Sequence, residues 1–178
     1  FLKLCGDSNM QVIYPTTGAQ IFHVLRRQLK RAFRVPLIVM TPKSMLRIPT
    51  STIDELTSGT FQEVLDDGRH DADASASGVK RVLLCSGKVY YDLLAERESR
   101  GASDVAIVRV EQYYPLRLDH LTPIINRYPK KAELVWVQEE PWNMGAWHFM
   151  SMRTAGAFGR RSLKGVTRPE SASPATGS

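Results

Sequence analysis

The residues of this 178-residue chain with the clearest chemical potential lie in QEEPWNMGAW, at positions 138–147. Gln138, Glu139 and Glu140 follow the apolar run LVWV. Two adjacent carboxylates suggest a general acid and a general base. Neighbouring residues of a strand, however, point to opposite faces of a sheet. We therefore expect one glutamate to face a crevice and the other to face a neighbouring segment, and we do not expect catalysis by the pair.

A second group is Ser86-Gly87-Lys88, which follows the apolar run VLLC and begins a predicted helix. Free N–H groups and the positive end of the helix dipole favour an anion at such a position, and Lys88 adds a positive charge. The segment lacks the upstream glycine of the phosphate-binding loop GxxxxGK[ST], so nucleotide hydrolysis is not supported. An ordinary helix start and a phosphate site both remain open, with the first favoured.

The rest of the sequence offers little catalytic chemistry. It contains no nucleophile with a paired base, no metal-ligand cluster and no glycine-rich cofactor loop, so we predict no catalytic residue and no metal ligand in this chain. His23, within AQIFHVLRRQ, is expected to be structural and to bond a neighbouring loop. Cys5 and Cys85 are far apart, and Cys85 ends an apolar run, which predicts a buried thiol in a reducing compartment.

These groups must be positioned by alternating strands and helices. MQVIYP, AQIFHVLRRQLKRAF and VPLIVMTP predict a strand, a helix and a parallel second strand. Thr16 or Thr17 is the expected helix cap. The helical spacing predicts an apolar face formed by Ala19, Phe22, Leu25 and Leu29, with Arg26, Arg27 and Lys30 on the other face.

The second part of the chain repeats this alternation. KRVLLCSG, DVAIVRVEQYYP and ELVWVQEEP are predicted strands separated by the helices KVYYDLLAERESRG and LDHLTPIINRYPK. This order predicts an α/β three-layer sandwich with a mostly parallel sheet. Ligands bind such sheets beyond the carboxyl ends of the strands. We expect a crevice or interface that includes His23, Glu111, Gln112, Gln138, Glu139, Glu140, Asn143 and Trp147.

Three weaker segments complete the prediction. A capping box from Ser51 to Asp54 predicts a short helix at TIDEL. Residues 66–78 are rich in Asp, Ser, Ala and Gly, which predicts a flexible surface loop. The tail from Ser151 is rich in Gly, Arg, Ser and Pro and is predicted to be mobile.

The net charge of +6 requires anionic partners to be considered. Basic residues concentrate within 26–34, yet the chain has no helix-turn-helix signature, zinc-finger spacing or aromatic ribonucleoprotein motif. We therefore predict no nucleic-acid partner, and interpret the basic cluster as a solvated helix face or a subunit contact. No apolar stretch approaches the ~20 residues of a membrane span, so no membrane partner is predicted.

Several segments together resemble one known family. They are NMQVIYPTTGAQIFHVLRRQ, PLIVMTPKSMLR, KRVLLCSGKVYYDLL, DVAIVRVEQYYPL, WVQEEPWNMGAW and RPESASPATG. Together they resemble the C-terminal region of the first component of 2-oxoglutarate dehydrogenase, with PTTGAQ at positions 15–20 where PSTPAQ is common. The resemblance implies thiamine diphosphate and Mg²⁺ as cofactors, with their ligands upstream of Phe1. It also implies decarboxylation of 2-oxoglutarate and succinyl transfer to dihydrolipoyl succinyltransferase, in a complex with dihydrolipoyl dehydrogenase.

The resemblance further implies a domain division. Residues 1–42 would end a pyrimidine-binding domain, and residues 43–178 would form a transketolase-type C-terminal domain that lacks its last helix. A homodimer, an inactive isolated region, and a location in the bacterial cytoplasm or mitochondrial matrix are expected.

Two alternatives stay open. One is a related enzyme acting on 2-oxoadipate. The other is a regulatory acyl-CoA or nucleotide-binding module, because some actinobacterial members of the family bind acetyl-CoA on this domain. Its candidate anion site is Arg47, Arg81, Ser86 and Lys88.

Overall fold

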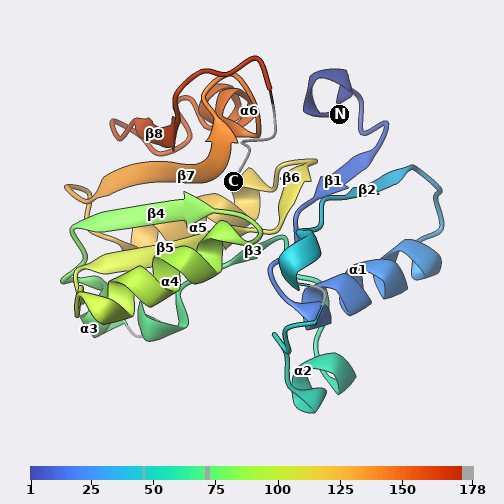
Figure 1. The fold of residues 1–178 in the computed structure, drawn as a ribbon, viewed down its shortest axis with the longest axis horizontal. Coiled ribbons are helices and arrows are strands. Elements are labelled where there is room, and N and C mark those ends of the chain that lie inside the picture. The colour runs from blue at the N-terminus through green and yellow to red at the C-terminus, as the bar shows by residue number, and fades with distance from the viewer. Residues whose placement is uncertain (46, 71–72, 174–178) are drawn as a thin grey trace.

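The computed structural model describes residues 1–45, 47–70 and 73–173 and shows two sheets with helices packed on them (Figure 1). The strand orders are β3-β5-β4-β7-β8 in the larger sheet and β2-β1-β6 in the smaller. The predicted α/β class with a mostly parallel sheet is confirmed. Within the described ranges, no helix is long and apolar enough to cross a membrane.

The larger sheet is parallel except at one edge. Its strands are β3 (Val64–Leu65), β4 (Arg81–Cys85), β5 (Val105–Val110), β7 (Glu133–Pro141) and β8 (Leu163–Arg168). β4 pairs in parallel with β5 and β7, β7 pairs in parallel with β8, and only β3 runs antiparallel to its neighbour. The carboxyl ends of β4, β5 and β7 therefore meet at one edge.

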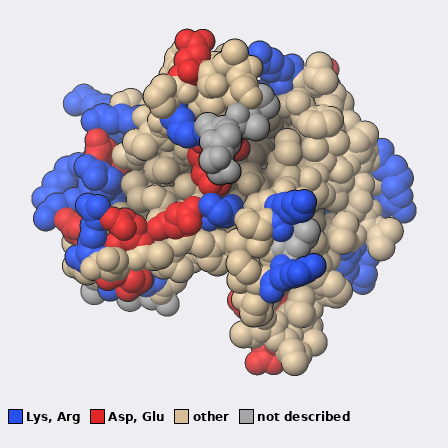
Figure 2. Space-filling view, viewed as in Figure 1, with Lys and Arg blue, Asp and Glu red and all other residues tan. Residues whose placement is uncertain are grey.

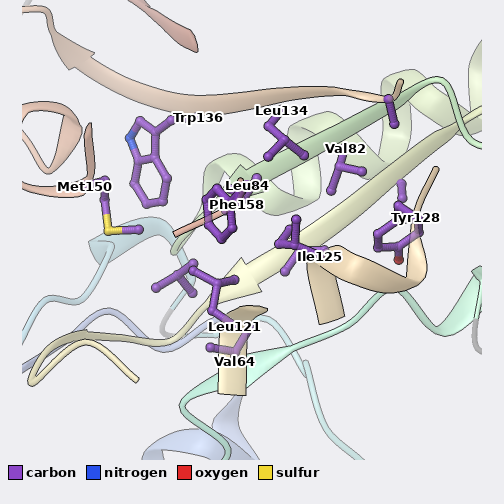
Figure 3. Packing of buried hydrophobic residues seen from close by; sticks show 14 of the residues in the cluster. Val64, Val82, Leu84, Leu121, Ile125, Tyr128, Leu134, Trp136, Met150 and Phe158 are labelled. Carbon is purple, nitrogen blue, oxygen red and sulfur yellow. The ribbon is translucent and has the colours of Figure 1, made fainter. Parts of the chain in front are cut away.

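Helices cover both faces of this sheet because successive strand residues alternate sides. α4 (Val89–Ser99) packs on the face that carries Leu83 and Cys85, whereas α5 (Leu118–Arg127) packs on the face that carries the fully buried Val82 and Leu84. Figure 3 shows this second core, in which the labelled residues are Val64, Val82, Leu84, Leu121, Ile125, Tyr128, Leu134, Trp136, Met150 and Phe158. The predicted three layers are present, and the Cys85 thiol is buried as expected.

The smaller sheet joins the two parts of the chain. β1 (Gln11–Ile13) and β2 (Leu37–Val39) pair in parallel around α1 (Gly18–Lys30), which is the predicted crossover, and β6 (Gln112–Tyr114) pairs antiparallel with β1. The single strand predicted for DVAIVRVEQYYP is wrong. It divides at Glu111, because β5 belongs to the larger sheet and β6 to the smaller one.

The predicted apolar face of α1 is also wrong. Phe22, Leu25 and Leu29 are 46%, 50% and 77% exposed. The buried residues of α1 are Ala19, Gln20, His23 and Val24. The polar members of this set bond other segments of the chain, so the hydrophobic spacing alone indicated the wrong face. Thr17 caps the helix by accepting the backbone N–H of Gln20 at 3.2 Å, which confirms one of the two predicted caps.

A short helix, α2 (Ile53–Thr57), follows the 3₁₀ turn Lys43–Met45. Its capping box joins Thr52 and Glu55, one residue later than predicted from Ser51 and Asp54. Ser51 instead accepts the backbone N–H of Ala19 at 2.8 Å, so its hydroxyl holds the start of α1.

The flexible loop predicted for residues 66–78 is wrong in the part that the structure describes. Asp66 accepts hydrogen bonds from Arg127 and Tyr128, and Asp67 forms a buried ion pair with Arg97. The segment also contains the 3₁₀ turn Gly68–His70 and α3 (Asp73–Ala76), while positions 71–72 of the predicted loop lie outside the described residues. Charged side chains that looked solvated therefore anchor this segment.

The mobile tail predicted from Ser151 is likewise wrong up to residue 173. α6 (Trp147–Arg153) packs near β8, and β8 extends the larger sheet beside β7. Positions 174–178 of that prediction lie outside the described residues. The remaining element is a 3₁₀ turn at Leu2–Leu4.

Candidate functional site

The polar residues that follow β4 and β7 meet at the carboxyl edge of the larger sheet, as the parallel order requires. The Lys88 ammonium lies 3.0 Å from the Glu139 carboxylate and 2.9 Å from the Asp92 carboxylate. Acidic and basic side chains adjoin one another over α4 on the face shown in Figure 2. Lys88 therefore links the end of β7 to the first turn of α4, and its charge is balanced by two carboxylates.

Glu111 lies fully buried at the point where the chain passes from the larger sheet to the smaller one. Its carboxylate accepts the backbone N–H of Thr16 at 2.8 Å and the hydroxyl of the same residue at 2.6 Å. The side-chain amide of Gln20 donates a third bond at 3.4 Å. Burial raises the pKa of Glu111, although these hydrogen bonds and the charge of Arg109 oppose the shift. Glu111 therefore fixes the start of α1 against the larger sheet.

Gln112 faces α1 and not the crevice. Its side-chain oxygen accepts a bond from Arg27 at 2.6 Å, and its amide nitrogen donates to the Pro115 carbonyl at 2.8 Å. Both polar ends of the side chain are thus occupied within the chain.

Gln138 lies in the last part of β7 and bonds the turn that follows the strand. Its side-chain oxygen accepts the backbone N–H groups of Ala146 and Trp147 at 3.1 and 2.8 Å, and its amide nitrogen donates to the Met144 carbonyl at 2.8 Å. Gly145 has φ +67°, and a Cβ there would lie 2.7 Å from the Gln138 amide nitrogen. Gln138 therefore holds the turn that follows the strand and satisfies free N–H groups at the start of α6.

Glu139 and Glu140 point to different surroundings, which agrees with the alternation of a strand. Glu139 is exposed and bonds Lys88, whereas Glu140 is partly buried and lines a cavity of about 470 Å³. This cavity lies between the N-terminal segment, residues 1–3, and the turn that precedes α6, residues 143–146. Tyr14 and Tyr113 also line it, and burial, with the nearby charge of Glu140, raises the pKa of both hydroxyl groups.

The cavity can accept and donate hydrogen bonds, but it lacks a nucleophile paired with a base. Two neutral phenols can donate to a polar ligand, and the Glu140 carboxylate can accept from one. Sequence reasoning missed Tyr14 and Tyr113, because aromatic residues at strand ends resemble core residues. The available signal was their position near the ends of the apolar runs that finish at Ile13 and Val110.

The remaining interface candidates use their polar atoms within the chain. Asn143 and Ser171 exchange two hydrogen bonds of 2.9 and 3.1 Å. The Trp147 ring packs on Gly165, where a Cβ would lie only 2.7 Å from the ring. His23 Nε2 lies 2.7 Å from the Glu55 carbonyl oxygen, which is the loop contact that the sequence predicted for this histidine.

The four residues proposed as an anion site do not come together. Arg81 begins β4 and pairs with Glu133 at 2.7 Å, whereas Ser86 and Lys88 follow the opposite end of that strand. The buried Ser86 hydroxyl donates to the Val110 carbonyl, and Arg47 is exposed in the turn after residue 45. Basic side chains beside a helix start suggested a phosphate site, but a strand of five residues spans about 13 Å and separates Arg81 at its start from Ser86 and Lys88 beyond its end.

A basic cavity of about 320 Å³ lies elsewhere, beside α1. The sequence identified its charge cluster without its concave shape, because the opposite wall comes from residues 60–61. Within the described ranges, no group of three or more His, Cys, Asp or Glu residues could hold a metal ion. The residues present therefore do not fit an Mg²⁺-diphosphate site.

Comparison with known proteins gives two family matches. Residues 50–178 match the family described as 2-oxoglutarate dehydrogenase C-terminal, and residues 1–49 match the transketolase pyrimidine binding domain. Proteins named 2-oxoglutarate dehydrogenase E1 component are 49% identical in Cupriavidus necator and 47% identical in Haemophilus influenzae and Brucella abortus. Each alignment covers 99% of this chain but only 19% of the relative. The chain thus spans about a fifth of the length of these relatives.

Proposed function

The chain belongs to the 2-oxoglutarate dehydrogenase C-terminal family, and from this premise we propose that it supplies one region of a thiamine diphosphate-dependent dehydrogenase. The proposed reaction is oxidative decarboxylation of 2-oxoglutarate with transfer of the succinyl group to dihydrolipoyl succinyltransferase. The names of the relatives support the substrate, and the match of residues 1–49 to a pyrimidine binding domain supports the cofactor.

The bonds between Glu111 and Thr16 carry the role proposed for this chain. Thr16 lies in the segment that matches the pyrimidine binding domain, and Glu111 lies in the segment that matches the C-terminal family. A buried carboxylate with two short hydrogen bonds holds these segments in fixed register. The proposed role is therefore to position the end of a pyrimidine-binding domain against the C-terminal sheet, with the domain boundary near residue 42.

Further parts of the proposal concern what lies outside this chain. Mg²⁺ and thiamine diphosphate would be held by other residues of the enzyme, so the isolated chain would be inactive. A homodimer and a complex with dihydrolipoyl succinyltransferase and dihydrolipoyl dehydrogenase belong to the same proposal. The relatives named above are bacterial, which favours the bacterial cytoplasm over the mitochondrial matrix.

A chimaera tests this function. The chain would replace the matching region of the Cupriavidus necator relative, with which it shares 49% identity. The assay is 2-oxoglutarate-dependent reduction of an artificial electron acceptor, with and without thiamine diphosphate. Activity with 2-oxoglutarate should require the cofactor and should be retained after the replacement, because about four fifths of the chimaera, including the residues that would hold the cofactor, come from the relative.

The matched control is Glu111→Gln in the same chimaera, which keeps the shape but removes the charge of the carboxylate. It should lower activity if the contact with Thr16 sets the active geometry. A folded chimaera without any activity on 2-oxo acids would refute the proposed function.

The regulatory acyl-CoA module is the second candidate. The separation of Arg81 from Ser86 and Lys88 leaves it without a formed site, so it would require Lys88 to leave Asp92 and Glu139. Calorimetric titration with acetyl-CoA decides it. Binding that is lost in Lys88→Ala and kept in Arg81→Ala would support a site at the start of α4.

A further inference from the structure

The basic cavity beside α1 is built from two segments. One wall is the face of α1 and its last turn, and the other is the connection from α2 to β3. Its lining residues are His23, Arg26, Arg27, Lys30, Arg31, Thr60 and Phe61. Residues three and four positions apart are neighbours on a helix surface, so four cationic side chains line one wall of a space of about 320 Å³.

The positive charge in this cavity is poorly balanced. Glu63 is the carboxylate that pairs with Arg27, at 2.8 Å, and it also lies 3.8 Å from Arg117 and 3.2 Å from His120. Within the part of the chain that the structure describes, Arg26, Lys30 and Arg31 form no ion pair. The Glu63 carboxylate therefore balances only part of the positive charge of the cations around it.

The neighbouring positive charges affect the Arg27 guanidinium. Burial and the neighbouring charge of Arg31 lower the pKa of its guanidinium to about 10, although Glu63 opposes the shift. Nη1 donates to Glu63, and Nη2 donates to Gln11 and Gln112 at 2.9 and 2.6 Å. Its Nε is buried without a partner in the described structure. Buried N–H groups normally have partners, and a missing one points to an unseen ligand or water.

An anion with several charges would satisfy these groups better than a simple carboxylate. Guanidinium groups bind phosphate and carboxylate oxygens in forked pairs. Phosphate presents oxygens in several directions, which suits four cationic donors spread along one wall, whereas a carboxylate presents two in one plane. Phe61 does not offer an open ring for stacking, because the Arg27 guanidinium already covers it at 4.3 Å from the ring centre.

We propose that this cavity binds a phosphate or phosphoanhydride group through Arg26, Arg27, Lys30 and Arg31. The site is separate from the carboxyl edge of the larger sheet, since its lining residues belong to α1 and to the segment before β3. Its occupancy does not depend on the dehydrogenase function proposed above.

Calorimetric titration of the protein with inorganic phosphate, diphosphate and succinate at constant ionic strength tests the proposal. Diphosphate should bind more tightly than phosphate, and succinate more weakly than either. Arg26→Gln and Lys30→Gln should each raise the Kd for diphosphate about tenfold, because a charged hydrogen bond contributes about 1.5–3 kcal/mol. Both side chains are exposed, so neither change should lower the unfolding temperature by more than about 2 °C.

Two controls remove the same charge elsewhere. Arg160→Gln lies outside the cavity and is also exposed, and Lys88→Ala removes the cation at the start of α4. Neither should change the Kd. Equal affinity of the parent protein and Lys30→Gln would overturn the proposal, as would loss of binding in Lys88→Ala alone. Succinate binding as tight as diphosphate would overturn the phosphate assignment.

Discussion

Gly87→Ala should destabilise the protein more than a glycine-to-alanine substitution at any other exposed or loop glycine described in the structure. Gly87 has φ +65°, and a Cβ there would lie 2.2 Å from Cζ of the Tyr14 ring. The left-handed backbone costs a non-glycine residue about 1–2 kcal/mol. Displacing a ring that is packed between two sheets adds about 1–3 kcal/mol. We expect Gly87→Ala to lower the free energy of unfolding by about 2–5 kcal/mol, measured by urea titration.

Gly101→Ala is the matched control for this prediction. Gly101 has φ +59° at the end of α4, and a Cβ there would meet no atom within 4 Å. It should therefore cost only the backbone part, about 1–2 kcal/mol. The difference between the two variants isolates the contact with Tyr14. Adding Tyr14→Ala to each variant should cost less in the Gly87→Ala background, because the clash is then gone. Equal losses in Gly87→Ala and Gly101→Ala would show that the Tyr14 ring does not rest on Gly87.

Three further outcomes are expected. Gln138→Leu should lower the free energy of unfolding by about 2–4 kcal/mol, because several buried N–H and C=O groups lose their partners, and near-UV circular dichroism should report the change around Trp136. The pKa of Glu111 is raised above 4.5 in the folded state, so this group stabilises the fold below pH 4.5 and loses that contribution as the pH rises through its folded pKa. In denaturant titrations, the free energy of unfolding of Glu111→Gln should therefore decline less between pH 4.5 and 7 than that of the parent protein. Parallel curves for the two proteins would contradict the assignment. Leu29→Ser should change stability by less than about 0.5 kcal/mol, whereas Val24→Ala, at a fully buried position, should cost about 2 kcal/mol; the opposite order would restore the apolar face predicted from spacing.

The three central strands of the larger sheet, β4, β5 and β7, could be predicted because their signals are local. The runs that contain Leu84 and Trp136 are apolar, bounded by polar residues and separated by helices of ordinary length. The parallel order followed from that alternation, and with it the shared edge of Ser86 and Gln138. Each of these inferences needs only neighbouring residues and general rules of sheet construction.

The failures have a common physical cause, since each depends on a partner distant in the sequence. Asp67 was predicted to lie in a solvated loop, but it forms a buried ion pair with Arg97, which is 30 positions later in the sequence. β8 contains charged residues and a glycine, and it forms a strand because β7 offers an unpaired edge. No window of the sequence around Val110 distinguishes one long strand from two strands in different sheets.

The role of Gln138 could not be predicted from the sequence. A glutamine after an apolar strand suggested a ligand contact at Gln138, whereas the structure uses both ends of its amide to hold a turn. Arg27 was predicted to be a cation on an open helix face, whereas in the structure it is partly buried and its Nε has no partner among the described residues. Side-chain roles depend on distances across the fold, which residue type and spacing do not specify.

The pairing of β1 with β6 affects how the chain can be made and divided. Val12 lies opposite Tyr114, which is 102 positions further along the chain. One edge of β1 therefore stays unpaired while the ribosome synthesises most of the larger sheet. Closing so long a loop slows folding. During that interval the exposed border of β1 is open to pairing with other chains. Cleavage of the backbone in the exposed turn near residue 47 would leave two pieces that stay associated because β1 of one piece pairs with β6 of the other.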